Sequence, residues 1–150
     1  MFIFILLLSL ISVGIISATY FFLVLGLTIV AYILYAIGCY KVFQKANVPG
    51  IYAWIPIVNE YFAYKIAWGT PAFIVTLVAD IVAHFNQDGG KISFGWIFSI
   101  VSVVVNFMFT QKLSKAFGKS EFFGLGLFFF QPIFLIILGF GDAQYLGKQN

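Results

Sequence analysis

Long apolar runs alternate with short polar breaks along the whole chain, and this pattern predicts membrane helices. Residues 2–43 are almost wholly apolar. One helix of that length would be about 60 Å long, twice the thickness of the hydrocarbon core of a bilayer. We therefore expect two helices that meet at Ser17-Ala18-Thr19. The full set of expected spans is 2–17, 20–43, 71–86, 92–110 and 122–139.

The segment 49–68 does not fit this pattern, because it is rich in tyrosine and tryptophan and is interrupted by Pro56. Neither half is long enough to cross a bilayer. Tyrosine and tryptophan favour the headgroup level of a membrane. The segment is therefore predicted to be a broken interfacial or re-entrant helix, and Thr70-Pro71 begins the next span as a helix cap.

Composition supports this interpretation. The chain has 150 residues, of which 63% are apolar and only 9% are charged, whereas a soluble domain carries about 25% charged residues. The prediction is an all-α integral membrane helical bundle, with about five transmembrane helices and one broken helix in a single membrane domain over 1–150. Cys39 is the only cysteine, so no internal disulfide can form.

All eight basic residues are lysine, and their distribution predicts an orientation. In the five-span arrangement, Lys41, Lys45, Lys65, Lys112, Lys115 and Lys119 fall on one side, and Lys91 and Lys148 on the other. The positive-inside rule then places the N-terminus in the cytoplasm and the C-terminus outside, in the periplasmic or extracellular space. The lysines are dispersed among membrane segments, which argues against a nucleic-acid partner.

Polar residues recur every four positions inside the third expected span: Thr76, Asp80 and His84. This spacing places them on one side of a helix. The next span carries Ser99, Ser102 and Asn106, so a tight hairpin would set Asp80 near Ser99 and Thr76 near Ser102. Two interpretations are open. The polar groups serve only to hold two helices together, or Asp80 and His84 form a proton or cation site.

Gln131 and Pro132 stand in the middle of the last expected span. Proline there removes a backbone hydrogen bond and kinks a helix. A structural kink is the main interpretation, and a gate or binding site is the alternative.

Enzyme signatures are missing from the sequence. It has no paired-histidine metal motif, no cysteine placed with a histidine as a nucleophile, and no pair of acids expected to be buried. We therefore predict no catalytic residue, no cofactor and no metal.

Two stretches resemble a family of small bacterial multi-pass inner-membrane proteins of uncharacterised function. Its members carry a "KAG-PGW…IPIYN" segment and an "FGK…LGFG-A-Y" ending. The matching residues are 42–50 (VFQKANVPG), 53–59 (AWIPIVN), 116–119 (AFGK), 123–127 (FGLGL), 132–134 (PIF) and 137–147 (ILGFGDAQYLG). In some relatives the module is joined to a signal peptidase I-like domain. The resemblance implies an inner-membrane scaffold or accessory module, near export machinery, and it transfers no catalytic residue.

Three functions are compatible with these observations. The first is a non-catalytic accessory or structural subunit, whose partners are the lipid bilayer and a larger membrane protein complex. The second is a small proton, cation or solute carrier that uses the face with Asp80 and His84. The third is an export-linked membrane protein.

Overall fold

Helices make up nearly all the regular structure in the computed structural model, which describes residues 18–85 and 95–149. Within those ranges the chain contains no strand. The elements are α2 (Ala18–Lys45), the short 3₁₀ helix η1 (Gly50–Trp54), α3 (Val58–Ala67), α4 (Thr70–Phe85), α5 (Gly95–Ala116), α6 (Glu121–Phe129) and α7 (Gln131–Phe140). The expected span 2–17 and the loop 87–91 lie outside the described residues.

Two of the described helices are long and apolar enough to cross a membrane, namely α2 over Tyr20–Lys45 and α5 over Trp96–Ala116. The all-helical prediction is therefore confirmed, whereas a five-span bundle is not. Helix α5 continues to Ala116, beyond the expected end of its span near residue 110. Its last turns carry lysines, which suit the negative end of a helix dipole and reach towards water along an apolar stem.

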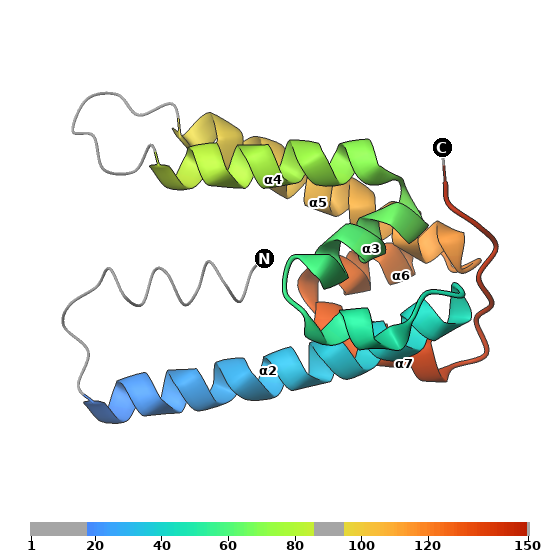
Figure 1. The fold of residues 1–150 in the computed structure, drawn as a ribbon, viewed down its shortest axis with the longest axis horizontal. Helices are drawn as coiled ribbons and strands as arrows, with labels where there is room; N and C mark the ends of the chain where they lie inside the picture. Colours follow the sequence, from blue (N-terminus) through green and yellow to red (C-terminus); the bar gives the residue numbers. More distant parts are fainter. Residues whose placement is uncertain (1–17, 86–94, 150) are drawn as a thin grey trace.

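The long helices project from one packed end of the molecule (Figure 1). Helix α2 forms one arm, and the hairpin of α4 and α5 forms the other. At the packed end, a core of buried side chains joins the C-terminal halves of α2 and α5 to the short helices. Its largest fully buried members are Tyr64, Phe43, Phe117, Leu113, Leu127, Leu135 and Leu138. We call this region the packed end; it includes η1, α3, α6, α7 and the C-terminal tail.

The break in the segment 49–68 falls around Pro56, between η1 and α3. The Val58 amide donates to the Pro56 carbonyl at 2.7 Å, which closes a γ-turn on Ile57. Ile57 has a φ of 67° and a ψ of −48°, a strained conformation for a β-branched residue. Asn59 Nδ2 then donates to the Ala53 carbonyl at 3.1 Å and fixes the start of α3 against η1.

The chain does not form one helix over residues 122–139, as the sequence predicted, but reverses direction at Phe130. The rings of Phe123 and Phe134 lie 5.1 Å apart, although a continuous helix would separate these positions by about 16 Å. Contacts of Gln111 with Gly124, and of Phe107 with Phe128, show that α6 runs back along α5. Helix α7 then returns, so that α6 and α7 form a hairpin.

Pro132 therefore begins a helix and does not kink one. It stands in the first turn of α7, where the missing N–H is no loss and its fixed φ suits the helix. The Phe130 carbonyl accepts from the amides of Ile133 and Phe134, both at 3.1 Å. The expected kink at Gln131 and Pro132 is thus replaced by a full reversal, whose tip is rich in phenylalanine.

Helix α7 packs along the C-terminal half of α2 and runs in the same direction. Gly38 faces Leu135, and Gly139 faces Lys41. Lys45 Nζ donates to the carbonyls of Leu138 (2.8 Å) and Gly141 (2.5 Å). The lysine thus caps the C-terminus of α7, whose last carbonyls have no partner within the helix.

The C-terminal tail crosses the packed end and is held there by backbone hydrogen bonds. The Leu146 amide donates to Ala116 at 2.7 Å, and the Gln149 amide donates to Ala67 at 2.9 Å. Tyr145 donates through its hydroxyl to the Ile66 carbonyl at 2.9 Å. The tail and Lys148 therefore lie at the same end as Lys45 and Lys112, whereas the five-span prediction placed them at opposite ends. The hairpin of α6 and α7 is the reason.

Candidate functional site: a buried polar cluster

Helices α3 and α4 form an antiparallel pair around a tight turn at Gly69, which has a φ of 137°. The two helices are joined by a buried hydrogen bond between Tyr64 and Thr76, whose oxygens are 3.1 Å apart. Thr76 also donates to the Ala72 carbonyl at 3.0 Å. A hydroxyl has one proton, so Tyr64 is the donor and Thr76 the acceptor.

This hydrogen bond fixes which residues of the two helices face each other. One turn farther from Gly69, Glu60 on α3 is opposite Asp80 on α4, because each is four residues from a member of the Tyr64–Thr76 pair. The electrostatics agree, since the charge of Asp80 acts on Glu60. Two carboxyl groups from different helices are thus within electrostatic range of each other.

Helix α5 completes the third side of this group. Phe109 stacks on the Tyr64 ring with centroids 4.3 Å apart. Ser102 lies beside Asp80, and its side chain is only 5% exposed. Its hydroxyl is therefore held beside the Asp80 carboxyl group and away from solvent.

Helix α2 contributes Tyr35, which lies within electrostatic range of Glu60 and next to the buried Cys39 thiol. We call the whole group the polar cluster. Its members are Tyr35, Glu60, Tyr64, Thr76, Asp80 and Ser102.

The structure brings together some of the polar residues that the sequence predicted as a site. Thr76, Asp80 and Ser102 come together. Asp80 lies beside Ser102, whereas the expected hairpin set it near Ser99, and Thr76 bonds to Tyr64.

Asn106 and Gln131 are not members of the polar cluster. Asn106 is half-buried on α5, one turn beyond Ser102. His84 lies in the last turn of α4, and its side chain is outside the described part. Gln131 stands at the tip of the hairpin of α6 and α7.

Glu60 and Tyr64 were not predicted as site residues. The sequence contains the signal, because the spacing of four that joins Thr76 to Asp80 also joins Glu60 to Tyr64. The aromatic composition of residues 49–68 favoured an interfacial position. The spacing of four was therefore not followed from α4 back across the turn at Gly69 into α3.

The environment of Glu60 favours its neutral form. Burial raises the pKa of its carboxyl group, and the charge of Asp80 raises the pKa further. Burial likewise raises the pKa of the Tyr64 hydroxyl. Two nearby carboxyl groups are more stable with one proton between them than with both groups ionised. The pair is therefore suited to binding a proton or a small cation. The described residues contain no group of three histidine, cysteine, aspartate or glutamate side chains that could hold a metal ion.

Glu60→Gln is expected to gain stability relative to the wild type as the pH rises from 4 to 8. A carboxyl group with a raised pKa binds its proton more tightly in the folded state, so the unfolding free energy of the wild type falls as the pH rises through that pKa. Thermal unfolding in detergent across this range measures the difference. Glu121→Gln is the matched control with the opposite sign, because the hydrogen bond and charge of Lys115 lower the pKa of Glu121. A constant difference between Glu60→Gln and the wild type would contradict the prediction.

Comparisons with known proteins give one match. A family of unknown function, DUF5684, matches residues 51–148, which is about two thirds of the chain and includes α3 to α7. No curated protein and no solved structure matches the chain.

Proposed function

Since the chain belongs to DUF5684, a family whose function is unknown, we propose from its geometry that it is a multi-pass membrane protein that binds and transfers a proton or small cation at the polar cluster. The observation that supports this proposal is the position of Glu60 within electrostatic range of Asp80, with the Ser102 hydroxyl beside Asp80. Ionisable residues at membrane depth are costly, and they mark ion pathways and proton relays.

The chemistry of the polar cluster fits this role. A transport site must hold its ion without binding it too tightly, and the negative charge of one carboxyl group raises the affinity of its neighbour for a proton or a small cation. The hydroxyls of Tyr64, Thr76 and Ser102 add oxygen atoms that suit a small hard cation.

We propose that the packed end faces the cytoplasm of a bacterium, with the other end across the inner membrane. Seven of the eight lysines belong to the elements that meet at the packed end, namely the C-terminal parts of α2 and α5, helix α3, the turn before α6 and the C-terminal tail: Lys41, Lys45, Lys65, Lys112, Lys115, Lys119 and Lys148. The positive-inside rule favours this orientation. The C-terminus is then cytoplasmic, in contrast to the expectation from five spans.

Reconstitution in liposomes tests the function. With a pH gradient and a valinomycin-clamped potential, the wild type is expected to carry protons, and Asp80→Asn to lower the initial rate at least about tenfold, because the amide cannot take up the proton. A sodium gradient in the same liposomes distinguishes a cation from a proton. Asp142→Asn, outside the polar cluster, is the matched control. Equal fluxes with wild type, Asp80→Asn and empty liposomes would overturn the proposal.

A second candidate is an accessory subunit of a larger membrane complex. The observation that favours it is the exposure of the N-terminal half of α2, where Tyr20, Phe22 and Leu27 are each more than half exposed. No described residue covers this face. A link to export machinery would be one form of this role. Co-purification with a larger assembly in mild detergent, lost when Leu27 is changed to lysine, would support it over a stand-alone carrier.

A further inference from the structure

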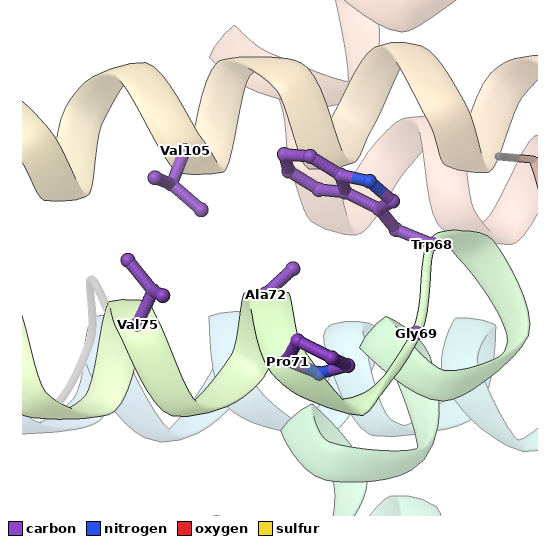
Figure 2. Close-up of a pocket in the computed structure, with 6 residues that line it drawn as sticks. All are labelled: Trp68, Gly69, Pro71, Ala72, Val75 and Val105. Atoms are coloured by element: carbon purple, nitrogen blue, oxygen red, sulfur yellow. The ribbon is translucent and has the colours of Figure 1, made fainter.

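A second site lies on the outer side of the α4–α5 hairpin, where an apolar cavity of about 300 Å³ opens between the two helices. Figure 2 shows its walls. Val105 comes from α5, Val75, Ala72 and Pro71 come from α4, and Trp68 reaches from the end of α3 towards α5. The indole nitrogen is the only polar side-chain atom among the lining residues. Such a lining suits a hydrocarbon ligand.

A cation stands next to one end of this cavity. Lys112 lies seven residues beyond Val105 on α5, and therefore two turns farther along nearly the same face of the helix. Its Nζ is 5.1 Å from the centre of the Trp68 ring and 3.5 Å from the Gln149 carbonyl. The lysine and the indole thus mark the level at which the packed end begins.

We propose that this cavity binds one acyl chain of an anionic phospholipid, with the phosphate group next to Lys112 and Trp68. An apolar groove with a cation at the end nearest the headgroup level is complementary to such a lipid in shape, polarity and charge. Basic pockets between membrane helices bind anionic headgroups, and tryptophan favours the same level of the bilayer. The exposed side chains of Pro71 and Val75 leave the cavity accessible from the outside.

This inference requires the hairpin to lie in a bilayer, but it does not require transport by the polar cluster. The test uses the full chain in detergent and measures binding of dioleoyl phosphatidylglycerol and dioleoyl phosphatidylcholine by native mass spectrometry. These two lipids have identical acyl chains, so any difference in binding comes from the headgroup. The wild type is expected to bind phosphatidylglycerol about fivefold more tightly than phosphatidylcholine, because this is the affinity that one lysine adds next to an anionic headgroup.

Two pairs of variants locate the site. Lys112→Gln is expected to remove the preference for phosphatidylglycerol, whereas Lys119→Gln, an equal change of charge at the packed end, keeps it. Val75→Trp fills the cavity and is expected to weaken binding of both lipids at least about threefold. Val78→Trp places the same bulk on α4 at a residue of similar exposure outside the cavity, and it leaves binding unchanged.

Three results would overturn the inference: equal affinity of the wild type for the two lipids, equal effects of the two lysine variants, or equal effects of the two tryptophan variants. Asp80→Asn separates this site from the polar cluster, since it is expected to lose transport and to retain the lipid preference. If Asp80→Asn lost the lipid preference as well, the two sites would not be independent and the assignment to Lys112 would fail.

Discussion

A cysteine introduced by Lys148→Cys is expected to react with a membrane-impermeant maleimide from the same side of the membrane as one introduced by Lys119→Cys. A third variant, Trp96→Cys, is expected to react only from the opposite side. The tail and the start of α6 are both part of the packed end, whereas Trp96 lies in the first turn of α5 at the far end and is exposed. Each variant should therefore show an all-or-none difference between intact and inverted vesicles.

The physical reason is the length of the two helices between Lys119 and Lys148. Helices α6 and α7 contain 9 and 10 residues, so each is about 15 Å long, or half the hydrocarbon thickness. Their exposed phenylalanines at the tip, Phe129 and Phe130, suit the middle of a bilayer. The native Cys39 is 2% exposed and does not interfere with labelling. Labelling of Lys148→Cys and Lys119→Cys from opposite sides would mean that residues 122–139 cross the membrane.

The hairpin also shows what a hydrophobic pattern can and cannot predict. An apolar stretch of 18 residues predicts burial in lipid, and this holds equally for one helix that crosses and for two helices that return. Whether one helix or a hairpin forms depends on Phe130, whose backbone leaves the helical region (φ −127°, ψ 49°). It also depends on glycines, which leave room for the side chains of a neighbouring helix. At Gly126 a side chain would collide with the Phe134 ring. Such contacts are long-range properties that a local pattern does not contain.

The polar cluster was predictable in part. The spacing of Thr76 and Asp80 placed both on one side of α4, and Ser102 was recognised on the next helix. The contribution of α3 was not predicted, because its residues were assigned to an interfacial segment. Tyr64 joins the cluster through its hydrogen bond to Thr76 and its stacking on Phe109. Sequence spacing therefore gave the face of the helix, and tertiary packing gave its neighbours.

Gly38→Ala is expected to destabilise the protein by about 1–3 kcal/mol, the usual cost of overpacking a close contact. A Cβ atom at Gly38 would lie 2.7 Å from Leu135 Cβ and 2.9 Å from the backbone nitrogen of Ile136. Because the second of these atoms belongs to the backbone of α7, no change of rotamer can relieve the collision. Helices α2 and α7 would have to move apart, although alanine is the better helix former.

Gly26→Ala is the matched control, because it makes the same change in the same helix. Nothing lies within 4 Å of the position where its Cβ would stand, so the variant is expected to be neutral or stabilised by up to about 1 kcal/mol. Thermal or denaturant unfolding in one detergent compares the two.

Small residues let helices approach closely in lipid, and here that approach also positions Lys45 to cap α7. Loss of the contact should therefore free the hairpin of α6 and α7, so that Gly38→Ala also increases proteolysis of the tail after Lys148. Equal stability of Gly38→Ala and Gly26→Ala would show that α7 does not rest on α2.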